Sequence, residues 1–83
     1  MLPSVNGAAG AELDQADQRR VLLAEIADWK VARYQFQVRH RVAKAIGDPQ
    51  KHLDDLRQQL ERCERAIDAL HEELRLLEQP QTP

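Results

Sequence analysis

Apolar residues recur along the second half of the chain with a strict spacing of three or four positions. The run is unbroken and consists of Leu53, Leu56, Leu60, Cys63, Ile67, Leu70, Leu74 and Leu77. An average step of about 3.5 residues is the heptad spacing that keeps one face of an α-helix against a partner helix. The pattern therefore predicts a long helix with a single apolar face, which a second helix must cover.

The first half of the chain also has a helical pattern, but its apolar residues form two sets. At about 100° per residue, the first set is a stripe of Leu13, Ala16, Leu23, Ala27, Val31, Tyr34, Val38, Val42 and Ala45. The second set lies almost opposite and contains Leu22, Ile26, Trp29 and Phe36, interleaved with Arg33 and His40. We expect the first stripe to pair with the second helix, which leaves the second set uncovered in a single hairpin.

Gly47, Asp48 and Pro49 separate the two patterns. We expect Gly47 to close the first helix in the left-handed conformation, Asp48 to cap the second helix, and Pro49 to occupy its first turn. A connection this short returns the second helix antiparallel beside the first. The expected fold is an all-α, single-domain, two-helix antiparallel coiled-coil hairpin. Its parts are a disordered leader at 1–10, a helix at 11–46, a turn at 47–48, a helix at 49–78 and a disordered tail at 79–83.

Length and composition narrow the class of protein. At 83 residues the chain is near the size at which a single core is marginal, so association with another chain is expected. The net charge of −2 does not mark the whole chain as a nucleic-acid binder. The single cysteine, Cys63, excludes an internal disulfide, and no apolar run approaches the roughly 18 residues that a membrane span needs. Because the beginning of the chain also lacks the pattern of a secretory signal, we expect a cytoplasmic protein.

The uncovered set on the first helix leads to a hypothesis about function. Packed Trp and Phe side chains each bury roughly 150 to 250 Å², so exposed Trp29 and Phe36 would create a patch of binding-site size. We expect a partner to bind the face made of Leu22, Ile26, Trp29, Arg33, Phe36 and His40. The expected assembly is a homodimeric four-helix bundle that serves as an adaptor, a chaperone-like protein or an assembly factor. Docking on a different helical protein is the second form of this hypothesis.

Charge is distributed unevenly along the expected hairpin. Residues 29–66, which include the turn, carry nine bases and five acids, a net charge of +4. The remaining residues carry three bases and nine acids, a net charge of −6. Two hairpins packed antiparallel would set each basic end against the acidic end of the other. We therefore expect a head-to-tail dimer that higher salt weakens modestly.

The basic half of the first helix supports an alternative function. Its 3-4 spaced ridge contains Lys30, Arg33, Gln37, Arg41 and Lys44 and runs beside Trp29 and Phe36. Cations meet phosphates and rings can stack on bases, which is what RNA or single-stranded DNA binding requires. The alternative is therefore a nucleic-acid-binding hairpin dimer that uses Lys30, Arg33, Arg41 and Lys44.

The residues typical of catalysis and metal binding do not occur at working spacings. The segment that begins His71-Glu72 resembles the start of a zinc-protease helix, but Arg75 stands where the second histidine is required. His40 and His52 are on different helices and make a weak ligand set by themselves. Cys63 occupies a position of the apolar face, where a thiol behaves as a small buried hydrophobe. We expect a non-enzymatic protein without a metal or a cofactor.

Overall fold

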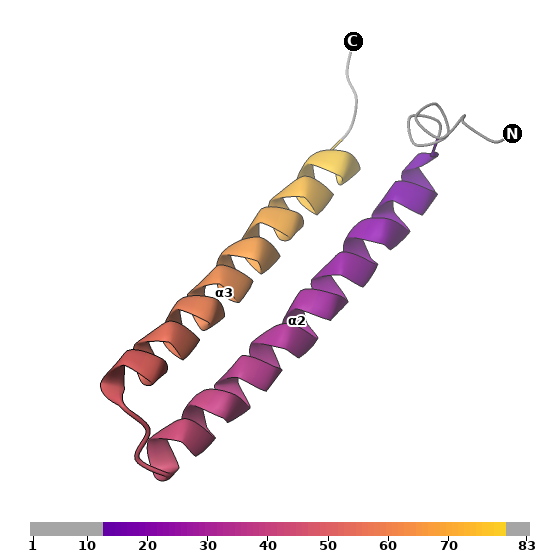
Figure 1. Cartoon of the computed structure of the whole chain (residues 1–83). Coiled ribbons are helices and arrows are strands. Elements are labelled where there is room, and N and C mark those ends of the chain that lie inside the picture. Colours follow the sequence, from indigo (N-terminus) through magenta and orange to yellow (C-terminus); the bar gives the residue numbers. More distant parts are fainter. Residues whose placement is uncertain (1–12, 80–83) are drawn as a thin grey trace, which may run out of the picture.

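The computed structural model describes residues 13–79, which form two long helices joined by a tight turn. Helix α2 is Gln15–Ala45 and helix α3 is Gln50–Glu78. They run antiparallel and pack against each other along their length, with the start of α2 beside the end of α3 (Figure 1). No strand occurs between residues 13 and 79. The prediction of an all-α hairpin is thus confirmed, while the predicted leader lies within residues 1–12, outside the described part of the chain.

Helix α2 begins at Gln15, where Asp14 caps it, while the predicted start at Ala11 lies outside the described residues. The Asp14 carboxylate accepts a hydrogen bond of 2.8 Å from the backbone N–H of Asp17. The Gln18 side-chain amide also donates to the Leu13 carbonyl, at 2.6 Å. These bonds satisfy polar groups that the first turn of a helix leaves without partners.

The turn uses glycine as predicted but caps α3 differently. Gly47 has a φ of 79°, in the left-handed region that glycine adopts without strain. The N–H of Asp48 donates to the Ala43 carbonyl at 2.9 Å and that of Gly47 donates to Lys44 at 3.3 Å, which is the Schellman arrangement. The N-cap of α3 is Pro49, without a side-chain cap. Asp48 instead pairs with the His52 ring, whose Nδ1 lies 2.8 Å from its carboxylate.

The core is a narrow seam between the two helices. Helix α3 contributes the run predicted from its spacing, since Leu56, Cys63 and Ile67 are buried. The other members of that run are half-buried: Leu53, Leu60, Leu70, Leu74 and Leu77. Cys63 is only 2% exposed. The prediction that this run forms the inner side of the hairpin is confirmed.

The face that α2 turns toward α3 is the opposite of the predicted one. Ile26 is 4% exposed, and Leu22, Trp29 and Phe36 are half-buried. In contrast, Val31 and Tyr34, which were expected to pair with α3, are 58% and 61% exposed. The assignment of the two faces of α2 was therefore wrong, and the set with the aromatic rings forms the seam.

The length of the sequence repeat explains which apolar set of α2 packs against α3. The α3 run repeats every seven residues, so a partner set stays in contact with it only if it also repeats every seven. On α2 two series do so: Gln15, Leu22, Trp29, Phe36 and Ala43, and Arg19, Ile26, Arg33 and His40. The stripe that was expected to pair advances in steps of four, four and three, which repeats after eleven residues and rotates away from a heptad seam. The heptad set also contains the two largest apolar rings, whose burial contributes most.

Candidate interaction surface

The six predicted partner-binding residues lie in the two heptad series of the seam. Ile26 is buried, and Leu22, Trp29, Arg33, Phe36 and His40 are half-buried. Both series also contact α3 directly at the open end of the hairpin, through Gln15 and Arg19. Most of the apolar surface of this set is thus used within the chain. Binding of a partner by these six residues stays a prediction, and only their exposed edges would remain for it.

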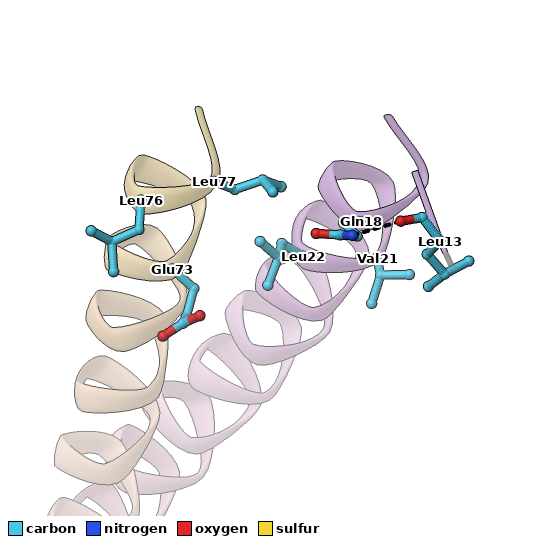
Figure 2. A pocket seen from close by; sticks show the side chains of 7 residues that line it. All are labelled: Leu13, Gln18, Val21, Leu22, Glu73, Leu76 and Leu77. Atoms are coloured by element: carbon cyan, nitrogen blue, oxygen red, sulfur yellow. Dashed lines mark hydrogen bonds between the residues drawn. The ribbon is translucent and has the colours of Figure 1, made fainter. Parts of the chain in front are cut away.

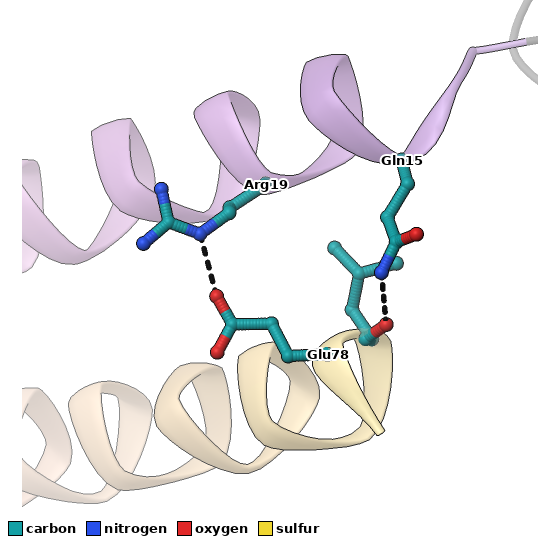
Figure 3. Close-up of polar contacts among 4 residues, drawn as sticks. Gln15, Arg19 and Glu78 are labelled. Carbon is teal, nitrogen blue, oxygen red and sulfur yellow. Dashed lines mark hydrogen bonds and ion pairs between the residues drawn. The ribbon is translucent and has the colours of Figure 1, made fainter. Parts of the chain in front are cut away.

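Polar contacts hold the open end together, as Figure 3 shows. The Gln15 side-chain amide donates to the Leu77 carbonyl at 2.7 Å, and Arg19 Nε lies 2.5 Å from the Glu78 carboxylate. Both side chains of the ion pair are substantially exposed, at 53% and 44%. Exposed pairs of this kind contribute less than about 1 kcal/mol. Their main effect is to fix which residues of α2 lie opposite the end of α3.

Two polar residues interrupt the middle of the α2 seam. Arg33 and His40 occupy heptad positions that usually hold apolar side chains, and both are half-buried. The Nε2 atom of His40 is buried and finds no hydrogen-bond partner within the described part of the chain. Burying polar atoms without partners weakens a seam. The hairpin therefore has a less stable interface than the α3 run alone indicates.

The surface of α2 that faces away from α3 is apolar. Residues two positions from the seam on such a helix lie about 150° away from it. Here they are the charged Asp17 near the start of α2 and then Ala24, Val31, Val38 and Ala45, of which Val38 is half-buried. With the adjacent Ala27, Tyr34 and Val42, the four apolar residues make up what we call the outer face. Val31, Tyr34 and Val42 are each more than half exposed. Three large apolar side chains thus remain uncovered on one side of one helix.

The corresponding surface of α3 is polar, which makes the hairpin two-sided. The positions of α3 on the side away from the seam are all exposed and mostly polar. The polar ones are Lys51, Asp54, Asp55, Gln58, Glu61, Arg62, Arg65, Asp68, Glu72 and Arg75, and the apolar ones are Ala69 and Leu76. The Arg75 guanidinium donates hydrogen bonds to the Glu72 carboxylate, which lowers the pKa of Glu72 and raises that of Arg75. These residues favour contact with water. Of the two described helices, α2 therefore offers the larger apolar surface for association.

Two shallow apolar grooves open beside the seam. The one at the open end encloses about 410 Å³ between Leu13, Val21, Leu22, Leu76 and Leu77, with Glu73 at its edge. Figure 2 shows Leu22 and Leu77 pointing toward each other across the helices, while Leu76 points outward. The other groove, of about 290 Å³, lies near the turn and includes Val42, Ile46 and Arg39. Val42 belongs to the outer face, so this face continues into the groove at the turn.

The predicted nucleic-acid ridge is only partly assembled. Lys30, Arg41 and Lys44 are exposed, whereas Arg33 is half-buried in the seam. The rings expected to stack on bases are used elsewhere, because Trp29 and Phe36 pack in the seam and Arg39 lies over Phe36 at 5.3 Å from the ring centroid. Tyr34 is the large ring left exposed near these cations. Nucleic-acid binding stays a prediction. The two rings that were expected to stack on bases, Trp29 and Phe36, are half-buried in the seam.

The described residues also bear on metal and membrane binding. Between residues 13 and 79, no group of three or more His, Cys, Asp or Glu side chains is placed to hold a metal ion. Neither α2 nor α3 is long and apolar enough to cross a membrane. The thiol of Cys63 is buried in the seam and not paired in a disulfide. The outer face of α2 is the surface feature with the clearest chemical consequence.

Comparisons with models of protein families, with curated proteins and with solved structures found no match. The function is therefore inferred from the geometry and charge of this chain alone.

Proposed function

We propose that this protein is a non-enzymatic interaction module, a helical hairpin that binds another helical surface through the outer face of α2. In the form that we favour, the other surface is a second copy of the chain, and the four-helix dimer serves as an adaptor or assembly factor. The observation that carries the proposal is the exposure of Val31, Tyr34 and Val42, at 58%, 61% and 52%, on a face with few charges.

The exposed area supports a weak rather than a permanent complex. Burying the remaining surface of each of these three side chains contributes roughly 1 kcal/mol, which is roughly 6 kcal/mol for the faces of two copies. Association of two proteins costs about 4 kcal/mol or more in lost freedom of motion. Since estimates of that cost extend to about 15 kcal/mol, the gain lies near the lower end of the cost, and the dimer is expected to be weak and to form only at high protein concentration.

The positions of the apolar faces also support a particular arrangement of helices. On α2 the seam and the outer face are about 150° apart, whereas a square four-helix bundle places the two contacts of each helix closer together. Helix α3 has no second apolar face. The proposed dimer is therefore a flat layer in which the two α2 helices lie inside and the two α3 helices lie outside.

Light scattering over a range of protein concentrations tests the proposal. The test variant is Val31→Ser with Tyr34→Ser, because serine has nearly the same helix propensity as valine and tyrosine. The control is Leu76→Ser, which removes another exposed apolar side chain, 46% exposed, on the other helix. We expect the wild type and the control to dimerise at high concentration and the double variant to stay monomeric with unchanged helix content.

Two results would contradict the proposal. A dimer that persists unchanged in the double variant would place the interface elsewhere on the hairpin. A wild type that stays monomeric at every concentration would exclude self-association through the outer face.

A further inference from the structure

We infer that the second copy lies antiparallel on the outer face, with the two-fold axis between residues 34 and 35 of α2. This inference rests on the proposed function, since it specifies how the two copies of the proposed dimer meet. It assigns each residue of the outer face an opposite residue in the other copy.

From Ala24 to Ala45, the line of positions furthest from the seam has a symmetric sequence, whereas Asp17, which precedes Ala24 in the same line, has no counterpart in α2. Ala24, Val31, Val38 and Ala45 read the same in both directions. An antiparallel copy centred between residues 34 and 35 sets Val31 opposite Val38 and Ala24 opposite Ala45. A parallel copy would pair each residue with itself and would pack side chains of the same sizes, so packing alone permits both directions.

Charge decides between the two directions. The first half of α2, residues 15–28, holds the acids Asp17, Glu25 and Asp28 and two arginines. The second half, residues 29–45, holds five bases and no acid, namely Lys30, Arg33, Arg39, Arg41 and Lys44. A parallel pair would bring the two basic halves together, and like charges at such distances repel. An antiparallel pair sets each basic half against the acidic half of the other copy.

The rest of the hairpin adds to this preference. The turn end, residues 29–66, has a net charge of +4, and the remainder of the chain has a net charge of −6. Since α2 and α3 run side by side, an antiparallel dimer places each positive end beside a negative end. The charge pattern thus selects the same direction at the scale of one helix and of the whole hairpin.

Tyr34 and Gln35 flank the proposed axis. Because the axis passes between them, each lies within about one residue rise, 1.5 Å along the helix, of its own counterpart. Tyr34 is 61% exposed, so its ring is free to meet the ring of the other copy. Ala24, in contrast, lies about 31 Å along the helix from its own counterpart and beside Ala45 of the second copy.

Disulfide cross-linking of variants that each carry one introduced cysteine in addition to the buried Cys63 tests these distances. A disulfide needs Cα atoms within about 7 Å of each other. Under mild oxidation with glutathione disulfide, we expect Tyr34→Cys to form a covalent homodimer and Ala24→Cys and Ala45→Cys to form none by themselves. A mixture of Ala24→Cys and Ala45→Cys should cross-link. Wild type is the control for Cys63, which is 2% exposed and should give no product.

Tyr34→Cys also removes a ring from the interface, so Gln35→Cys provides a second variant that keeps Tyr34. Cross-linking of Ala24→Cys with itself would show a parallel pair and would overturn the inference while leaving the proposed dimer intact. A dimer by light scattering in which neither Tyr34→Cys nor Gln35→Cys cross-links would also overturn it. A wild type that is monomeric in light scattering, with no cross-link in any variant, would overturn the proposed function itself.

Discussion

The assignment of the two faces of α2 can be tested directly by shortening one side chain on each. The variants are Ile26→Ala on the seam and Val31→Ala on the outer face. Both replace a β-branched residue by alanine within the same helix, less than two turns apart. Ile26 is 4% exposed and Val31 is 58% exposed.

The expected destabilisations differ severalfold. Ile26→Ala removes three buried carbon atoms at about 0.8 kcal/mol each, and the cavity left behind adds to this loss. The higher helix propensity of alanine returns only about 0.4 kcal/mol, so the net loss is about 2 to 3 kcal/mol. Val31→Ala removes two carbon atoms that are mostly in water already, a loss of roughly 0.7 kcal/mol. Because the propensity gain nearly offsets that loss, folding of the hairpin should change by less than about 0.5 kcal/mol.

Urea unfolding followed by far-ultraviolet circular dichroism measures both values. The experiment belongs at low protein concentration, where the proposed dimer is dissociated and does not add to the stability of the wild type. We expect a clear loss of stability for Ile26→Ala and a near-unchanged transition for Val31→Ala. Equal losses, or a larger loss for Val31→Ala, would refute the placement of Ile26 in the seam.

The remaining predictions concern the turn, the start of α2 and the basic residues. Gly47→Ala should destabilise the hairpin by about 1 kcal/mol in urea unfolding, because its φ of 79° strains any side chain although no atom lies within 4 Å of the added Cβ; an unchanged midpoint would refute this. Asp14→Ala should lower the free energy of unfolding by about 1 kcal/mol and speed amide exchange in the first turn of α2; equal exchange in both proteins would exclude a capping role. Replacing Lys30, Arg41 and Lys44 by Gln should abolish any binding of a single-stranded RNA oligonucleotide measured by fluorescence anisotropy; binding that survives, or that salt does not weaken, would exclude the basic ridge.

Much of the fold follows from local patterns in the sequence. The unbroken run from Leu53 to Leu77 predicts α3 and its inner side, because a one-sided heptad pattern permits only one packing. Gly47 predicts the position of the turn, since a left-handed residue ends a helix sharply. The residues that cap the helices were harder to predict. The Asp48 carboxylate pairs with His52 instead of capping α3. Near the expected start of α2 the sequence offers two acids, Glu12 and Asp14, and Asp14 is the one that caps the helix.

The site was harder to predict, because α2 has two apolar sets and the longer one is on the outside. Counting apolar residues favours the outer set, and the polar Arg33 and His40 weigh against the inner one. The signal that selects the inner set is its repeat of seven residues, as in the series Leu22, Trp29 and Phe36. Pairing depends on matching the repeat of α3, which a helical wheel drawn for one helix does not show.

The two faces of α2 have a consequence for the substitutions that this chain can tolerate. A change on the outward side of α3 meets only water, so most polar residues are acceptable there. On α2, a polar residue in the seam weakens folding, and one on the outer face weakens the proposed association. The two sides of the hairpin should thus separate in a complete mutational scan read out by stability and by dimer formation: α3 would show one sensitive stripe, and α2 would show two, each sensitive in a different assay.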